Sequence, residues 1–304
     1  MFNLNSVAIS DGKAEEYYKL ITQNRKGIAQ ADKLCEKYFE KNFKEIILMK
    51  PNELQKFVKT FDSRKDKAAV VDAFKNLSVK TNPKNAGYIV NTLYQKMPHD
   101  ARKLIYNLAN VKTCPYCNRN YLDVIDGKEY HTTFELDHFY NKDDYPMLAV
   151  SLYNLIPSCP SCNRIKGKTT FQYYPYDSKR DMSSEIKFSY NVKSEIKFTE
   201  VKNEDDIEVK VKCDDSGMGE YLQELYSNHK DIALEIIQKT KFYGEGYAKG
   251  LCKQLGELFP SKAEVYRMLY GNYLDKEDWT KRPLSKFTYD IANEALKGLK
   301  IDKW

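Results

Sequence analysis

Apolar residues recur at helical spacing through the first hundred residues of the chain. After the start signal Pro51-Asn52, the positions i, i+3, i+4 and i+7 of one stripe are Leu54, Phe57, Val58 and Phe61. Similar periodicity recurs over residues 69–77 and 89–94. Because most amphipathic helices bury their apolar face, we expect these stripes to form a core rather than a partner-binding surface.

The pattern changes twice further along the chain. Residues 186–188, 196–198 and 207–211 alternate apolar with charged positions, which predicts a small antiparallel sheet with one solvated face. From Gly219 the spacing is helical again, with apolar faces formed by Leu222, Leu225 and Tyr226 and by Phe287, Ile291, Ala295 and Leu299. The predicted fold class is α+β and mostly helical. We divide the chain into an N-terminal helical region (1–110), a central module (111–180), and a small sheet followed by C-terminal helices (181–304).

Composition adds limited information about partners and location. The 304 residues carry a net charge of +6, a mild preference for polyanions. The opening residues lack the basic end and apolar core of a signal peptide, and the densest apolar run is only Ile46–Met49. We therefore expect a cytoplasmic protein with no membrane partner. Because that compartment keeps thiols reduced, clustered cysteines there favour metal binding over disulfides.

Four cysteines form two C-x-x-C pairs on either side of a long insert, residues 118–158. They are Cys114, Cys117, Cys159 and Cys162. Two such pairs can close a tetrahedral site with no position left for water, which is typical of structural zinc. The alternative is reduced thiols that bind no metal. We expect Cys35, Cys213 and Cys252, which stand alone, to be structural.

Between and beside these pairs lie residues that could carry chemistry. They occur in the order Phe134-Glu-Leu-Asp-His138-Phe, then Tyr153-Asn154, then Cys162-Asn163-Arg164-Ile-Lys166-Gly-Lys168. This order resembles the HNH endonucleases, which have the ββα-metal fold, in the branch that carries flanking C-x-x-C pairs. The resemblance covers about residues 113–169 and implies a central zinc-stapled ββα-metal module.

The resemblance also implies roles for individual residues. Asp137 and Asn163 would bind a catalytic divalent cation, His138 would be the general base, and Asn154 would hold the imidazole in place through its backbone or ring. Asn163 stands where many members of the family have histidine, and its oxygen favours magnesium, with manganese or another divalent ion as alternatives. Histidine titrates near neutral pH and can accept the proton of an attacking water.

Several of these residues also have ordinary structural explanations. A lone Asp-His pair is usually structural, but here it lies within the cysteine pairs and upstream of both asparagines. Arg164, Lys166 and Lys168 are candidate phosphate contacts, or else a solvated helix face. Glu135 could support the metal ligands or only be a strand residue. We assign no function to the remaining histidines, His99, His131 and His229.

The wording of the motifs also resembles the HNH subunits of bacterial antiphage systems, in particular the PtuB component of Septu. That likeness implies a defence nuclease working beside an ABC-type ATPase, with DNA as the favoured substrate. The same site could instead act on RNA such as transfer RNA. The alternative from another class is a non-catalytic zinc module that binds nucleic acid or a partner helix. Such a module would need the four cysteines but not Asp137, His138, Asn154 and Asn163.

Overall fold

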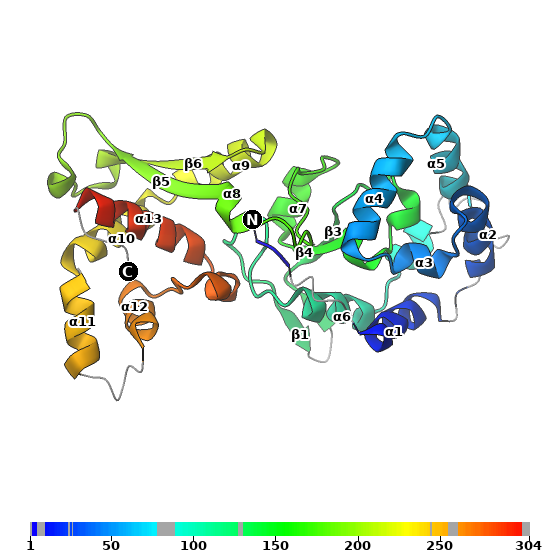
Figure 1. Ribbon diagram of the computed structural model, residues 1–304, viewed down its shortest axis with the longest axis horizontal. Coiled ribbons are helices and arrows are strands. Elements are labelled where there is room, and N and C mark those ends of the chain that lie inside the picture. The colour runs from blue at the N-terminus through cyan, green and yellow to red at the C-terminus, as the bar shows by residue number, and fades with distance from the viewer. Residues whose placement is uncertain are drawn as a thin grey trace. The chain divides into compact units, whose positions relative to one another are not determined.

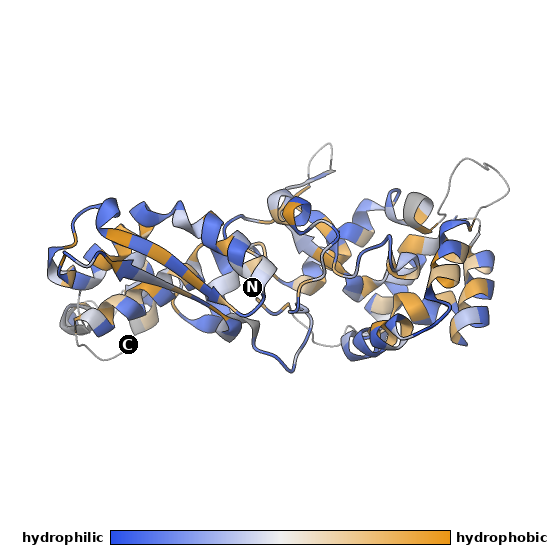
Figure 2. Cartoon of the chain, turned by 90° about the horizontal axis from the view of Figure 1, so that it is seen from above, coloured by the Kyte–Doolittle hydropathy of each residue, from blue (hydrophilic) through white to orange (hydrophobic). Residues whose placement is uncertain are grey.

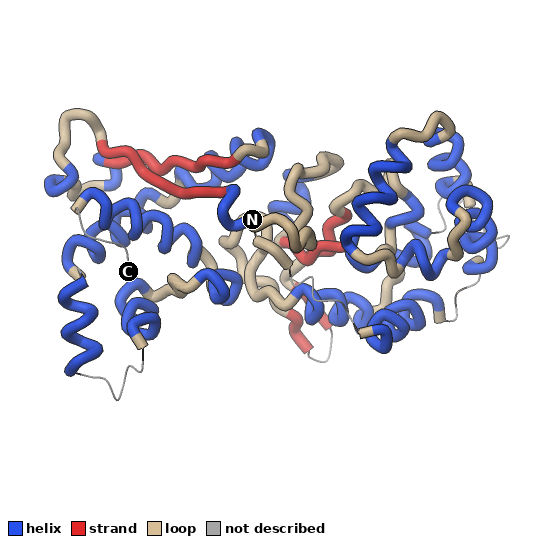
Figure 3. The backbone as a smooth tube through the Cα atoms, in the orientation of Figure 1, coloured by secondary structure: helices blue, strands red, loops and turns tan. Residues whose placement is uncertain are grey.

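The computed structural model describes residues 2–4, 10–23, 25, 27–77, 89–126, 130–243, 245–254 and 261–299. The chain divides into two compact units built from interleaved segments. The first unit contains residues 3–111 and 122–180, and the second contains residues 1–2, 112–121 and 181–304. Helices predominate in both, and the strands are short or paired as ribbons (Figures 1 and 3). None of the helices in the described ranges combines the length and the apolar character needed to cross a membrane.

The first unit begins with helices and continues into two antiparallel strand pairs. Its helices are α1 (Asp11–Thr22), α2 (Ile28–Phe39), α3 (Phe43–Ile47), α4 (Pro51–Asp62), α5 (Lys67–Lys75), α6 (His99–Ala109) and α7 (Pro160–Lys166). A π-helical turn spans Ile89–Tyr94, and 3₁₀ turns span Pro146–Leu148 and Leu152–Asn154. The strands are β1 (Val124–Asp126) with β2 (Tyr130–Thr132), and β3 (Glu135–His138) with β4 (Leu155–Ser158).

Helix α4 shows how the predicted apolar stripes fold. Pro51 occupies the first helical position, where its missing N–H costs nothing, and the Glu53 carboxylate accepts a hydrogen bond from the Lys50 backbone N–H at 3.2 Å. Leu54, Val58 and Phe61 are buried, and Phe57 is half-buried and stacks on Phe61 with ring centroids 6.2 Å apart. The predicted core stripe is confirmed.

The N-terminal helices support the loop that joins β3 to β4. The hydroxyl of the fully buried Tyr17 in α1 donates to the Val150 carbonyl at 2.9 Å. Ser151 donates to the Ile47 carbonyl at the end of α3 at 3.3 Å, and the Tyr145 hydroxyl donates to Asp62 of α4 at 2.7 Å. Because these bonds lie inside the unit, the helices fix the loop conformation as well as forming a core.

The second unit contains a two-stranded ribbon and its covering helices. Its helices are α8 (Met182–Glu185), α9 (Ser216–Ser227), α10 (Lys230–Phe242), α11 (Glu245–Gln254), α12 (Lys262–Tyr270) and α13 (Ser285–Gly298), and 3₁₀ turns span Phe198–Glu200, Glu204–Asp206 and Lys276–Lys281. Strands β5 (Ile186–Val192) and β6 (Ile207–Cys213) pair antiparallel over their whole length. Alternating apolar and polar residues along β5 are visible in Figure 2.

The prediction of a third strand at residues 196–198 is wrong. The Lys197 N–H donates to the Glu200 carboxylate, and the chain turns into the short 3₁₀ helix that starts at Phe198. The Phe198 ring stacks near Tyr190 of β5, with centroids 6.5 Å apart. The local cap and the packing of the Phe198 ring therefore explain why these alternating residues do not form a strand.

The ribbon is held on the helices by aromatic packing and by a hydrogen bond to a buried ion pair within α13. Phe188 of β5 lies 4.3 Å from Tyr226 of α9 and 5.4 Å from Phe287 of α13, measured between ring centroids. Asp290 of α13 accepts a hydrogen bond from the Phe188 backbone N–H at 2.9 Å and pairs with Lys286 at 2.6 Å. Burial lowers the pKa of Lys286 and raises the pKa of Asp290, so each charge depends on the other.

Replacing Asp290 by Ala should therefore destabilise the second unit strongly. The change leaves the Lys286 ammonium and the Phe188 N–H buried without their acceptor, which costs about 3–5 kcal/mol. The matched control is Glu294→Ala, which breaks a solvent-exposed pair with Lys297 on the same helix and should cost less than about 1 kcal/mol. Chemical denaturation measures both, and equal effects would refute the structural role of the buried pair.

Candidate functional site

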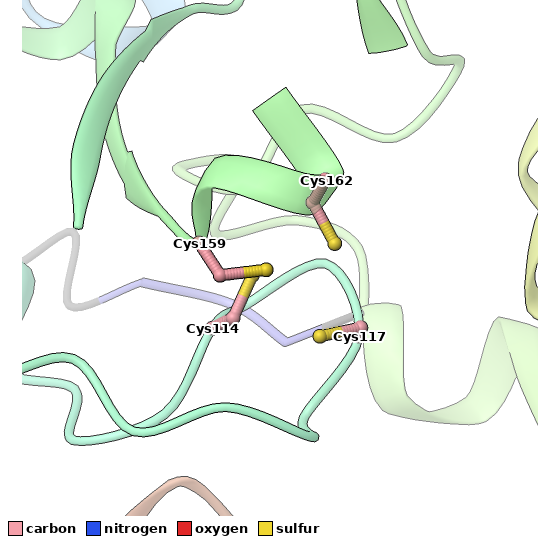
Figure 4. A group of neighbouring side chains, drawn as sticks. All are labelled: Cys114, Cys117, Cys159 and Cys162. Carbon is pink, nitrogen blue, oxygen red and sulfur yellow. The ribbon is translucent and has the colours of Figure 1, made fainter. Parts of the chain in front are cut away.

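The four paired cysteines meet in one cluster. All are buried, and their sulfur atoms lie within 4.8 Å of one another. Cys114 and Cys117 lie on a loop, and Cys159 and Cys162 lie at the start of α7, with their thiols converging (Figure 4). Four thiolates at about 2.3 Å from a central zinc would place the sulfurs about 3.8 Å apart, so this donor set fits structural zinc.

Backbone hydrogen bonds give the first C-x-x-C pair the shape of a metal-binding knuckle. The Asn118 N–H donates to the Cys114 carbonyl at 2.8 Å, and the Arg119 N–H points at the Cys117 sulfur at 3.3 Å. Asn118 has a positive φ of 52°, which lets the chain turn tightly around the thiols. Its buried side-chain amide donates to Thr113 and to the Trp279 carbonyl. These bonds fix the conformation of the loop around the two thiols.

The single cysteines are only partly described. Cys35 is fully buried in α2, where burial raises the pKa of its thiol, and Cys213 is half-buried at the end of β6. Both positions agree with the structural role predicted for them. The side chain of Cys252 lies outside the described residues.

Strands β3 and β4 and helix α7 bring the sequence motif together inside the first unit. The register pairs Asp137 with Ile156 and His138 with Leu155. Helix α7 starts directly after β4, with Pro160 at its first position and Cys159 as its N-cap. Its residues 163 and 166 are one turn apart and face β3, so each meets one of the strand residues 135 and 137.

His138 is held in one orientation and one tautomer. Its Nε2 atom lies 2.9 Å from the Ala149 carbonyl oxygen, which can only accept, so Nε2 carries the proton and Nδ1 is the free base. The ring packs on Tyr94, with centroids 4.2 Å apart, and Tyr94 itself donates to the Leu136 carbonyl at 2.7 Å. Burial lowers the pKa of His138 to about 3, so its imidazole is neutral at pH 7.

Asn154 forms hydrogen bonds with the backbone around His138. Its side chain is fully buried, accepts from the Tyr140 N–H at 2.8 Å, and donates to the carbonyls of Tyr140 at 3.0 Å and Leu148 at 3.1 Å. Its own carbonyl accepts from the Phe139 N–H at 2.9 Å. Of the two ways proposed for Asn154 to fix the imidazole, the described contacts favour the backbone.

Asp137 is buried against a lysine. The Lys166 ammonium lies 3.2 Å from Asp137 Oδ1 and donates to the His138 carbonyl at 2.9 Å, and both side chains are at most 2% exposed. Burial lowers the pKa of Lys166, whereas the charge of Asp137 opposes that shift. The Lys166 charge is directed inward at Asp137 and away from solvent, so the predicted contact with a phosphate would require the ammonium to leave Asp137 first.

Glu135 and Asn163 form a second pair, on the outer side of the same strand and helix. The Asn163 amide lies 2.5 Å from Glu135 Oε2. Asn163 therefore meets Glu135, whereas Asp137, its predicted partner in cation binding, meets Lys166. Carboxylate and amide oxygens, the kind that Glu135, Asp137 and Asn163 carry, are ligands that suit a hard divalent cation. A cation that used Asp137 would compete with the ammonium of Lys166.

The remaining predicted residues lie on the surface of the unit. Arg164 is exposed, and Lys168 is 78% exposed and forms an ion pair with Asp143 at 2.7 Å. His131 lies in β2 and His99 at the start of α6, both exposed. In the second unit, His229 precedes α10 and packs against Tyr226.

Sequence reasoning missed the parts played by Tyr94 and Lys166. The spacing of Asn163 and Lys166 could have revealed the second, since residues three apart lie on one helix face and would meet alternate residues of one strand. Tyr94 was assigned only to an apolar stripe, and it lies more than forty residues before His138. Its contact with the imidazole depends on tertiary packing and has no local signal.

Comparison with known proteins identifies one region of the chain. The sequence model of the HNH endonuclease family matches residues 114–169, which span the cysteine cluster, β3, β4 and α7. No curated protein and no solved structure matches the chain. An HNH endonuclease domain thus lies at residues 114–169 and suggests that the protein is a nuclease.

Purified protein should contain about one equivalent of zinc. The Cys114→Ser variant should lose this zinc and melt at a lower temperature, because a structural zinc site contributes directly to folding. Cys213→Ser is the matched control, since this half-buried thiol lies outside the cluster. Metal analysis by mass spectrometry and a melting curve measure both effects. A wild-type zinc content below about half an equivalent, or unchanged stability in Cys114→Ser, would contradict zinc binding by the cluster.

Proposed function

We propose that the chain is a metal-dependent HNH endonuclease that hydrolyses phosphodiester bonds, with DNA as its substrate. The main support is the orientation of His138. This neutral imidazole has its Nε2 proton fixed on the Ala149 carbonyl and lies in the region matched by the HNH endonuclease family. A binding module has no need for a histidine held in this way. We assign the central β3–β4–α7 segment to the ββα-metal arrangement of that family.

His138 acts as the general base in this proposal. Its Nδ1 takes a proton from the attacking water while Nε2–H stays on the Ala149 carbonyl, which stabilises the imidazolium that forms. A pKa near 3 would make the isolated imidazole a weak base. An anionic phosphodiester bound beside it favours the charged form and raises this pKa toward the working range. Asn154 is a positioning residue, because it acts on His138 only through the backbone.

Asp137 and Asn163 are the proposed ligands of the catalytic cation, with magnesium as the favoured ion and Glu135 as an additional oxygen donor. When bound, such a cation supplies charge stabilisation at the phosphoryl oxygen and the leaving oxygen. Before it can bind at Asp137, the Lys166 ammonium must give up its 3.2 Å contact. In this proposal the released ammonium then faces the phosphate, so Lys166 and the cation together neutralise the charges of Asp137 and the phosphate.

Arg164 and Lys168 are proposed to contact phosphates that flank the scissile bond. Arg164 is exposed one residue beyond Asn163, and a guanidinium suits the planar geometry of two phosphate oxygens. Lys168 is paired with Asp143, so a phosphate there would replace one surface ion pair with another at little cost. Such contacts position the backbone and carry no sequence information.

Cellular context follows only from the likeness of the motifs to antiphage HNH subunits. We propose a cytoplasmic defence role, in which an ABC-type ATPase partner controls the nuclease. A nuclease of this kind would harm its own cell without such control. Co-purification from the native operon tests the partner directly.

The decisive experiment compares cleavage by the wild type, His138→Ala and His131→Ala. Plasmid DNA and total RNA are each offered with magnesium and with EDTA. His138→Ala should lose at least about a hundredfold in rate, the scale of general-base catalysis. His131→Ala, an exposed histidine in β2, should keep full activity.

The outcomes separate the candidate functions. Magnesium-dependent cutting of DNA that vanishes only in His138→Ala supports the proposal. If only RNA is cut, the mechanism stands but its substrate is RNA. Cutting that survives in His138→Ala excludes this histidine as the base. If the wild type cuts neither substrate even with its co-purified partner, the non-catalytic zinc module becomes the better assignment.

Cation binding can be measured without catalysis. Asn163→Ala should weaken binding of manganese, followed by electron paramagnetic resonance, because it removes one oxygen donor. Lys166→Met should strengthen it, because Asp137 then loses its competing ammonium. Arg164→Met is the control, since it removes a neighbouring charge that is exposed and contacts no proposed ligand in the described structure. Unchanged manganese affinity in Asn163→Ala would count against the ligand assignment.

A further inference from the structure

One face of the β5–β6 ribbon is covered by helices, and the other is polar. The side chains of Ile186, Phe188 and Tyr190 in β5 are buried against the helical side. The alternate positions are the polar residues Lys187, Ser189 and Asn191 in β5 and Glu208, Lys210 and Lys212 in β6. Lys187, Asn191, Glu208 and Lys212 are exposed, and Ser189 and Lys210 are half-buried. We call these six residues the basic face of the ribbon.

The charge on this face is not balanced within the ribbon. The register places Lys187 directly opposite Lys212, and Ser189 opposite Lys210. Two lysines directly opposite each other in a sheet repel, which destabilises the pairing. Glu208 is the only acid among the six residues and it pairs with Lys210. The two directly opposed lysines therefore form a site where an external anion would relieve repulsion.

Both edges of the ribbon are closed by side chains from the helices. The Val211 N–H donates to Gln223 of α9 at 2.8 Å, and the Gln223 amide donates to the Val209 carbonyl at 2.9 Å. On the other edge Asp290 of α13 accepts from the Phe188 N–H. Because these edge groups are already bonded, pairing with a further strand is disfavoured there. Recognition on this ribbon would use its face.

We propose that the basic face of the β5–β6 ribbon binds the backbone of double-stranded DNA in its major groove. Seven residues per strand give a ribbon of about 23 Å, and a two-stranded ribbon fits the B-form major groove, which is about 12 Å wide. The lysines supply phosphate contacts, and Ser189 and Asn191 supply neutral hydrogen-bonding groups between them. This inference rests on the proposed nuclease function and names duplex DNA as its substrate class.

The test measures DNA binding separately from cleavage. All proteins carry His138→Ala, so the DNA stays intact, and the full chain is used. The test variant is Lys187→Glu/Lys212→Glu, which reverses the charge but keeps two like charges opposite each other. The control is Lys193→Glu/Lys197→Glu, which makes the same change in net charge at exposed lysines between the two strands. Fluorescence anisotropy gives Kd for a 30-base-pair duplex over a range of salt.

The test variant should bind duplex DNA roughly tenfold more weakly than the parent, and the slope of log Kd against log salt should fall by about 2. The control should stay within about twofold of the parent. Equal weakening in both variants would mean that only net charge matters, and it would overturn the proposal. So would an unchanged Kd in the test variant.

Binding to an RNA duplex of the same sequence tests whether the face prefers DNA. The A-form major groove is deep and narrow, so RNA should bind more weakly than DNA and be less affected by the substitutions. Equal sensitivity of DNA and RNA would overturn the assignment to the major groove of DNA. If the test variant does not fold, Lys187→Gln/Lys212→Gln replaces it. Failure of the cleavage assay would leave this binding result intact, so the two proposals fail separately.

Discussion

The geometry around His138 depends on the buried amide of Asn154. This one side chain bonds both the N–H and the carbonyl of Tyr140 and also the carbonyl of Leu148. It thereby links two points of the long connection between β3 and β4. Leu148 directly precedes Ala149, whose carbonyl accepts the hydrogen bond from the imidazole. An amide has one acceptor and two donors, and each is used here. Aspartate would lose both donors, and leucine would remove all three of these hydrogen bonds to the backbone.

Two adjacent residues of β3 differ in charge: Asp137 is paired with a lysine, whereas the imidazole of His138 is neutral. Asp137 and His138 follow one another along β3 but contact different elements: Asp137 meets α7 and its lysine, whereas His138 meets Tyr94 and the loop that follows β3. Charge is balanced on the side of α7, with Lys166 against Asp137. The imidazole is kept neutral by burial on the other side. The proposed general base and the proposed cation ligand therefore occupy neighbouring positions without forming an ion pair with each other.

The sequence predicted the parts of this arrangement that depend on local spacing. The two C-x-x-C pairs and the stripe in α4 follow from spacings of three to seven residues, and the order of Asp137, His138, Asn154 and Asn163 follows from a motif that spans residues 137–163. The inward turn of Lys166 was missed, because charge alone favours solvent and only the buried Asp137 offsets the cost of desolvation. The false strand at residues 196–198 has a local cause. Its alternation satisfied the period of a strand, while the cap formed by Glu200 decided the local conformation.

In each unit a buried ion pair lies where a helix packs on a strand, between the two elements in the first unit and within the helix in the second. In the first, Lys166 of α7 bonds Asp137 and the His138 carbonyl of β3. In the second, Asp290 of α13 bonds Lys286 and the Phe188 N–H of β5. A buried ion pair contributes little net stability compared with apolar side chains, because desolvation offsets most of the attraction. Its value here is specificity. A one-turn shift of α7 would break both contacts of Lys166 with β3, and a shift of α13, which carries both Lys286 and Asp290, would break the bond to the Phe188 N–H. In the first unit, that register also brings Asn163 to Glu135 and so defines the face where the proposed cation would bind.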